Sequence, residues 1–114
     1  MQLVQERISI ETLRKMSEKM FGGLVKAVVD VEAGIMVVDA GLHADQEQFL
    51  LQEGFAQKNL WGVNLYPDLA KDDSWIEFDS MINLRPGHNN RTRSVDNLET
   101  QDKVRSIINR LVIV

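Results

Sequence analysis

Cationic and hydrogen-bonding side chains are concentrated in one short segment, INLRPGHNNRTRS, from Ile82 to Ser94. This segment holds no acidic residue, although the chain of 114 residues carries a formal net charge of −4. Arginine forms paired hydrogen bonds with phosphate and carboxylate groups, and asparagine adds further donors and acceptors. We therefore expect the Arg-rich loop, residues 85–93, to recognise an anionic ligand or an acidic or phosphate-bearing partner. The residues expected to make the contacts are Arg85, His88, Asn89, Asn90, Arg91 and Arg93.

The alternative for the Arg-rich loop is that its arginines are solvated or pair with acidic residues elsewhere, such as Glu11 or Glu18. The loop leads into a helix whose predicted capping box is formed by Asp96 and Glu99. A helix N-terminus attracts anions, but Asp96 would already place a negative charge there. An anionic ligand is therefore expected on the loop, away from the helix end.

A second candidate site lies on the polar face of a predicted hairpin. In the expected register, Asn64 pairs with Glu77 and Gly62 pairs with Asp79. Glycine opposite a carboxylate leaves a hollow that a ligand or another backbone could approach. Glu77 and Asp79 could serve as acid and base or bind a divalent metal, so a metal-assisted hydrolase is the alternative function. A solvated sheet face that resists aggregation explains the same residues. Further charges expected on this side are Lys26, Asp30 and Asp39.

A third group of residues, Asp39, His43 and Asp45, has the composition of a metal site or a His–Asp dyad. His43 has no second histidine at ligand spacing, and Asp45 with Gln48 forms a predicted capping box. We therefore interpret the group as structural. No nucleophile-elbow, metalloprotease, P-loop or dinucleotide motif occurs, so no catalytic residue is assigned and no cofactor or metal is expected.

The first half of the chain predicts one helix and one hairpin. Ser9 is the expected N-cap of a helix that Gly22 ends, with its core face formed by Leu13, Met16, Met20 and Phe21. A short strand is expected over residues 3–7. The runs LVKAVVDV and IMVVDA predict strands joined by a tight turn at Ala33-Gly34. The core face of this hairpin is expected to hold Val25, Ala27, Val29, Val31, Met36, Val38 and Ala40, and the opposite face to be partly covered.

The second half predicts a helix from about Gln46 to Gly54, a second hairpin and a final helix. The second hairpin is formed by LWGVNLY and WIEFDSMINLR, and its turn spans residues 67–74. Its outer strand is expected to place Ile76, Phe78, Ile82 and Leu84 on one side, with Glu77, Asp79, Asn83 and Arg85 on the other. The final helix has its apolar face at Val104, Ile107, Ile108, Leu111 and Val112. We predict a single α+β domain over residues 1–114, a two-layer sandwich in which about three helices cover one face of a mostly antiparallel sheet.

Composition excludes several classes of protein. The absence of cysteine excludes disulfides, cysteine nucleophiles and zinc–thiolate sites. We do not expect non-specific duplex DNA as a partner, because binding requires many phosphate contacts and the chain is acidic overall. No apolar run approaches the length of about 20 residues that a membrane helix needs, and no signal peptide is evident, so we expect a cytoplasmic protein without a membrane partner.

Self-association is the third functional class that the sequence allows. Short hairpins leave unpaired sheet edges, and the C-terminal run LVIV is strongly apolar. We therefore expect a homodimer. Sedimentation at micromolar concentration should show a species of twice the chain mass, and a single species of 13.0 kDa would contradict this prediction.

Several spaced motifs resemble those of a family of small bacterial proteins known only as a domain of unknown function. They are KAVVDVEAGIMVVDAGLHAD, LWGVNLYP, WIEFDSMINLRP and NRTRSV, and they are distributed over nearly the whole chain. The resemblance implies a bacterial, cytoplasmic protein. It carries no activity, cofactor or catalytic residue, so the function has to be inferred from the residues themselves.

Overall fold

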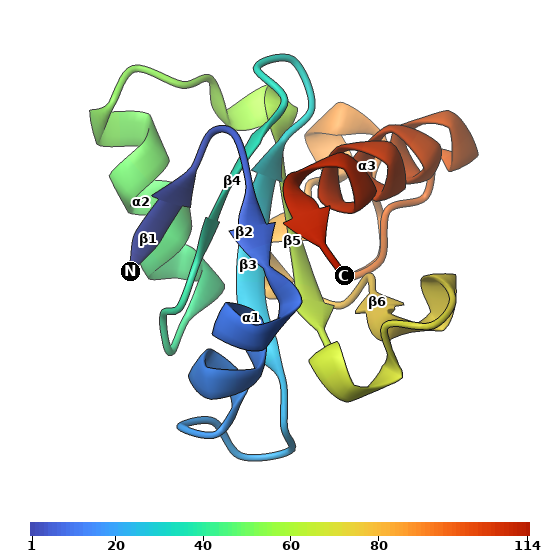
Figure 1. The fold of residues 1–114 in the computed structure, drawn as a ribbon. Coiled ribbons are helices and arrows are strands. Elements are labelled where there is room, and N and C mark those ends of the chain that lie inside the picture. The colour runs from blue at the N-terminus through green and yellow to red at the C-terminus, as the bar shows by residue number, and fades with distance from the viewer.

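A computed structural model describes all residues, 1–114, as an open five-stranded antiparallel sheet with three helices packed against it (Figure 1). The strand order is β1-β4-β3-β5-β6, and a separate two-stranded parallel sheet joins β2 to β7. This architecture confirms the predicted α+β class and the mostly antiparallel sheet. The bounds are β1 Gln2–Val4, β2 Ile8–Ser9, α1 Ile10–Ser17, β3 Val25–Asp30, β4 Ile35–Val38, α2 His43–Gln52, β5 Leu60–Leu65, β6 Ile76–Glu77, α3 Leu98–Leu111 and β7 Val112–Ile113.

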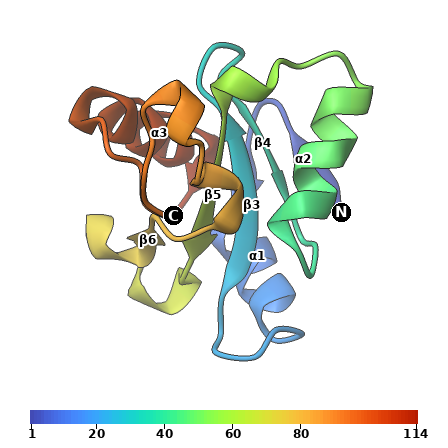
Figure 2. The same cartoon turned by 180° about the vertical axis from the view of Figure 1, so that it is seen from behind.

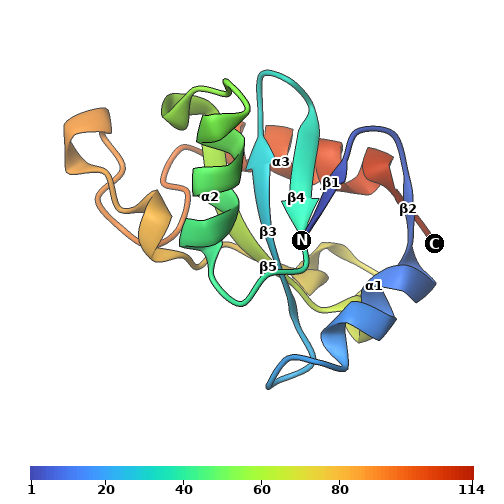
Figure 3. The same ribbon diagram turned by 90° about the vertical axis from the view of Figure 1, so that its left-hand side faces the viewer.

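The helices cover both faces of the sheet, so the prediction that they share one face is wrong. Helices α1 and α3 pack on the face of Ala27, Val29 and Met36, whereas α2 lies on the other side (Figure 3). There Leu50 packs against Val28 and Val37, which are fully buried. The physical reason is that this second face carries valines, and burying them requires a cover. No helix is both long and apolar enough to cross a membrane.

The hairpin of β3 and β4 has the predicted faces, but its register is shifted by two residues, because Val29 rather than Val31 lies opposite Met36. Its turn is longer than predicted, because Asp30 pairs with Ile35 and four residues lie between them. The buried Asp30 carboxylate accepts hydrogen bonds from the backbone N–H groups of the turn, at 2.9 and 2.8 Å. Asp30 therefore stabilises a turn.

The first helix begins as predicted and ends earlier. Ser9 caps it by accepting a hydrogen bond from the Thr12 N–H at 3.1 Å. The helix ends at Ser17, and Phe21, which the sequence pattern places in the core, is fully exposed. Phe21 lies in the turn after the helix, and Gly22 and Gly23 that follow it both adopt positive φ. The strand predicted over residues 3–7 is instead β1, because the chain bends directly after Val4.

The outer strand of the second hairpin is much shorter than predicted. Strand β6 ends at Glu77, and the chain then runs through short 3-10 turns at Met81–Asn83 and Pro86–His88 before α3 (Figure 2). Further 3-10 turns lie at Gln57–Asn59, Pro67–Leu69 and Asp73–Trp75. Ile82 consequently packs with the α2 cluster, whereas Ile76 and Phe78 belong to the larger core on the opposite face. The prediction that these residues share one face is therefore wrong.

Candidate functional site

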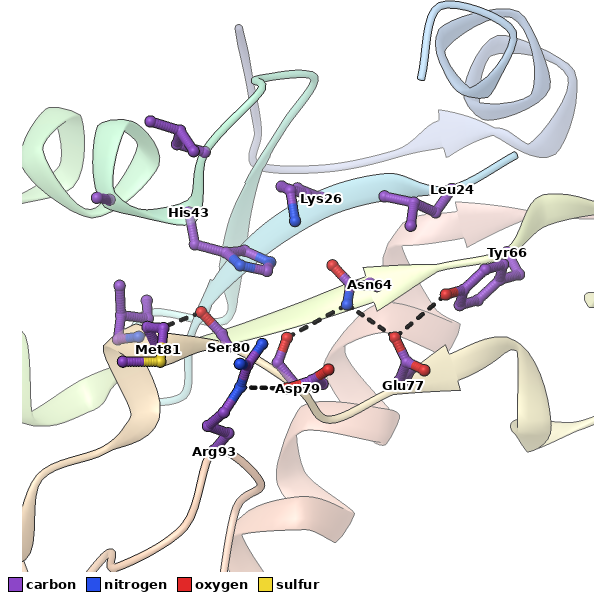
Figure 4. A pocket seen from close by; sticks show the side chains of 13 residues that line it. Leu24, Lys26, His43, Asn64, Tyr66, Glu77, Asp79, Ser80, Met81 and Arg93 are labelled. Atoms are coloured by element: carbon purple, nitrogen blue, oxygen red, sulfur yellow. Dashed lines mark hydrogen bonds and ion pairs between the residues drawn. The ribbon is translucent and has the colours of Figure 1, made fainter. Parts of the chain in front are cut away.

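A cavity of about 510 Å³ opens on the α2 side of the sheet. We call it the polar cavity. It lies where β3, β5 and β6 meet the first turn of α2 and the segment that follows β6 (Figure 4). The polar and charged side chains that line it are Lys26, His43, Asn64, Tyr66, Glu77, Asp79, Ser80 and Arg93. Thus several residues from two separate sequence predictions meet in one place.

Three of these residues form a row across neighbouring strands. Lys26 on β3 is opposite Asn64 on β5, and Asn64 is opposite Glu77 on β6. The Asn64 Nδ2 group donates to Glu77 Oε1 at 2.8 Å, which confirms the predicted pairing of these two residues. Since residues opposite one another in paired strands share a face, Lys26 lies on the same side. The row therefore places a cation at one end and a carboxylate at the other.

The amide of Asn64 is oriented by its surroundings and leaves one atom unsatisfied. Its Nδ2 donates a second hydrogen bond, at 3.2 Å, to the backbone oxygen of Asp79. Both donors thus point toward acceptors, and Oδ1 is buried without any hydrogen-bond partner. Only 5 % of Asn64 is exposed to solvent. A buried acceptor left unpaired costs about 1–3 kcal/mol, so Oδ1 is a position at which a donor from a ligand would be stabilised.

Glu77 is held in place by two donors. Besides Asn64, the hydroxyl of Tyr66 donates to Glu77 Oε1 at 3.2 Å. Partial burial and the adjacent Glu77 carboxylate raise the pKa of Tyr66, which keeps the hydroxyl protonated as the donor. Both hydrogen bonds use the same carboxylate oxygen, so Oε2 remains available.

The hollow predicted above Gly62 is filled. Since β6 ends at Glu77, Gly62 does not pair with Asp79, and that prediction is wrong. Its N–H and carbonyl are instead bonded to the side chain of Asn83, at 2.8 and 2.9 Å. A Cβ atom at Gly62 would lie 2.7 Å from both Cβ and Oγ of Ser80. Gly62 therefore permits a close approach of the chain itself, in the way that strand glycines commonly do.

Arg93 is the residue of the Arg-rich loop that reaches the polar cavity. Its Nε donates to Asp79 Oδ1 at 2.7 Å, so Asp79 is partly neutralised. The two terminal nitrogens of Arg93 form no hydrogen bond within the chain and remain available. The backbone carbonyl of Arg93 is used differently, because it accepts from the Ser80 N–H and from Asn83.

Arg85 and Asn90 support the loop structure. The Arg85 guanidinium stacks over Trp61 at 4.2 Å and donates to the carbonyls of Gln57, at 2.6 Å, and Leu60. Burial lowers the pKa of Arg85, and the nearby Glu47 carboxylate opposes that shift. Asn90 is buried and donates to three backbone carbonyls while accepting from the Asp96 N–H. Both side chains are thus directed into the protein, away from the polar cavity.

The remaining loop residues are exposed, and the predicted capping box after the loop is not formed. His88, Asn89 and Arg91 all lie at the surface. Asp96 accepts from Thr92 Oγ1 and from the Arg91 N–H, and these hydrogen bonds lower the pKa of its carboxyl. Because Asp96 is used in this turn, Asn97 caps α3 instead, accepting from the Thr100 N–H at 3.0 Å.

The third candidate group does not come together as a site. His43 Nε2 donates to the Val63 carbonyl at 2.8 Å, and burial lowers the pKa of the imidazole, which keeps it neutral. Asp39 pairs with Lys19 at 3.0 Å. Asp45 does not cap α2, which begins at His43 with Leu42 as an N-cap that forms no side-chain bond. No group of three or more His, Asp or Glu side chains is arranged to hold a metal ion.

The sequence interpretation missed His43, Tyr66 and Ser80 as parts of the cavity. His43 was grouped with its neighbours in sequence, although its contacts are with β5, twenty residues further along. The position of Tyr66 could have been predicted from strand alternation, because residues 64 and 66 lie on the same face as Lys26. No local pattern marks Ser80, since its position depends on the close packing at Gly62.

The chain matches one known protein family. Residues 2–111 match a family described as "Protein of unknown function (DUF5674)". The chain belongs to this family. No curated protein and no solved structure matches the chain. The DUF5674 assignment agrees with the resemblance noted from the motifs, and the function has to be inferred from the polar cavity.

Proposed function

We propose that this DUF5674 protein is a binding module that takes a small anion-bearing ligand in the polar cavity. Lys26 and Arg93 provide the cationic contacts. The observation that carries the proposal is their availability: Lys26 takes part in none of the ion pairs of the chain, and Arg93 uses only Nε for Asp79. Unpaired cations beside a cavity attract anions strongly, because hydrogen bonds between charged groups are about twice as strong as neutral ones.

Two further features support binding at this position. The first turn of α2 lines the cavity, and its N–H groups at His43 and Ala44 form no hydrogen bond within the chain, whereas that of Asp45 donates to the Leu42 carbonyl at 3.2 Å. Free N–H groups at a helix N-terminus favour negative charge. The second feature is Asn64 Oδ1, which is buried and has no hydrogen-bond partner within the chain, so a donor that reached it would be stabilised. Within the Arg-rich loop, the proposal assigns the contact with the anion to Arg93 alone.

A thermal-shift screen with phosphate, nucleotides, short RNAs, amino acids and divalent metal ions tests the proposal. A ligand at 100 times its dissociation constant stabilises the folded state by about 2.7 kcal/mol. For a domain of this size we expect the melting temperature to rise by about ten degrees. If Mg²⁺ or Mn²⁺ raised the melting temperature of the wild type but not of Asp79→Ala, the metal-assisted hydrolase built on Glu77 and Asp79 would replace this proposal.

Two single variants separate the cavity from the exposed part of the loop. Arg93→Ala should abolish most of the ligand-induced shift, whereas Arg91→Ala should leave it unchanged. Neither should change the free energy of unfolding by more than about 1 kcal/mol, because Arg91 is exposed and the Arg93–Asp79 pair is half exposed. Equal ligand responses from the two variants would contradict the assignment to Arg93.

A further inference from the structure

The charges of the polar cavity are separated into two ends. At one end, Lys26 and Arg93 lie near His43, together with the Asp79 carboxylate that pairs with Arg93 Nε, so this end keeps one positive charge in excess. At the other end, Glu77 lies beside Tyr66 (Figure 4). Asn64 is between them, with its amide donors turned toward Glu77 and its oxygen turned away. A ligand that fills the cavity therefore meets a cationic and an anionic end at once.

The anionic end is built to accept hydrogen bonds from a ligand. Glu77 is fixed through Oε1 by Asn64 and Tyr66, which leaves Oε2 free while the carboxylate cannot easily rotate away. Asn64 Oδ1 is turned away from Glu77 and does not add an acceptor at this end. A charged and free carboxylate oxygen matches an ammonium group, which carries three donors.

The rim of the polar cavity adds an apolar surface. Leu42 and Met81 line the opening, with 59 % and 62 % of their surfaces exposed, and Leu24 lies further along the wall. Exposed leucine and methionine beside charged groups can cover the aliphatic part of a ligand while its charged ends are paired. A fully hydrated inorganic ion would leave this surface uncovered.

We propose that the ligand of the polar cavity is a small zwitterion of the amino-acid class with an apolar side chain. Its carboxylate lies toward Lys26 and Arg93, and its ammonium lies toward Glu77 Oε2. The inference rests on the proposed binding function and adds the second charge and the apolar body of the ligand.

Three compounds that share the leucine side chain and differ in their charged groups test the inference by calorimetric titration at pH 6.5. L-leucine carries both charges, N-acetyl-L-leucine lacks the ammonium, and L-leucinamide lacks the carboxylate. We expect both blocked compounds to bind the wild-type protein at least about tenfold more weakly than L-leucine, because each loses a set of charge-assisted hydrogen bonds. This comparison requires no variant, so it does not depend on whether a substitution folds.

Two variants then assign each charge to its partner. Lys26→Gln should weaken the binding of L-leucine about tenfold, whereas L-leucinamide should bind within about twofold of its wild-type affinity. Glu77→Gln should weaken the binding of L-leucine to a similar extent and leave the affinity for N-acetyl-L-leucine unchanged. Lys71→Gln and Glu53→Gln make the same charge changes at exposed positions outside the cavity and should bind as the wild type does.

The outcomes separate this inference from the proposed function. If N-acetyl-L-leucine or inorganic phosphate binds as tightly as L-leucine, and Arg93→Ala weakens that binding, the inference of a zwitterionic ligand is wrong. The proposed anion-binding function then stands. The same conclusion follows if a nucleotide or phosphate binds through Arg93 while no compound of the leucine series binds. If no compound of either class binds, both are wrong.

Discussion

Asn83→Ala should lower the free energy of unfolding by about 3 kcal/mol or more, one of the two largest effects that we expect from a single substitution. Asn83 is fully buried, and its side chain bonds to the N–H and carbonyl of Gly62 and to the carbonyl of Arg93. Alanine would leave the N–H and carbonyl of Gly62 unpaired in the interior, whereas the Arg93 carbonyl would keep its hydrogen bond from the Ser80 N–H. Each buried group that loses its partner costs about 1–3 kcal/mol. Denaturant unfolding followed by circular dichroism measures the difference.

The same substitution should weaken ligand binding without touching the cavity. Asn83 joins β5 to the backbone of Arg93 and so fixes the position of the Arg93 side chain. Asn109→Ala is the matched control, because Asn109 is exposed and makes a single bond of 3.2 Å to Asp73. It should change stability by no more than about 0.5 kcal/mol. A decrease in the free energy of unfolding below about 1 kcal/mol in Asn83→Ala would show that the hydrogen bonds from Asn83 to Gly62 contribute little to stability.

Gly62→Ala should destabilise the protein by about 2 kcal/mol, although alanine is ordinarily preferred to glycine within a strand. The added Cβ would lie 2.7 Å from Ser80 Cβ and Oγ and 3.2 Å from Ile82 Cγ1. Ser80 cannot move aside easily, because its backbone N–H is bonded to the Arg93 carbonyl at 3.0 Å. The strain is therefore transmitted to the segment that carries Asp79 and Arg93.

A double-mutant cycle isolates the steric cause. Ser80→Gly removes the atoms that collide with the new methyl group, so the loss from Gly62→Ala should be smaller by at least about 1 kcal/mol in that background. Gly87→Ala is the control, because a Cβ at Gly87 has no other atom within 4 Å. Additive losses from Gly62→Ala and Ser80→Gly would exclude a direct clash between these positions.

The parts of the fold that could be predicted from the sequence are those determined by local pattern. Alternating apolar residues predicted which side chains of β3 and β4 share a face, although not their exact pairing, and Ser9 predicted the start of α1. The pairing of Asn64 with Glu77 followed in the same way from strand alternation. These features depend on neighbours close in sequence or on a single turn, so a periodic pattern contains the necessary information.

The parts that could not be predicted depend on contacts between distant segments. The outer strand after Glu77 has suitable alternation, but Asn83 satisfies the backbone of Gly62, and the strand ends. The Arg-rich loop appeared to be a cluster of cations, yet Arg85 stacks on Trp61 and Arg93 alone enters the polar cavity. Composition locates charged residues in the sequence, whereas packing determines which of them face the same space. Homodimer formation stays a prediction.

Whether ligands bind in the polar cavity is tested most directly by nuclear magnetic resonance of the ¹⁵N-labelled protein. The compound with the largest thermal shift should be titrated while the side-chain NH₂ signals of Asn64 and the backbone signals of Lys26, His43 and Arg93 are followed. We predict that these signals move together, with one dissociation constant, and that the signals of His88, Asn89 and Arg91 remain in place. Movement confined to the exposed loop residues, with the Asn64 signals unchanged, would contradict the assignment of the binding site to the polar cavity.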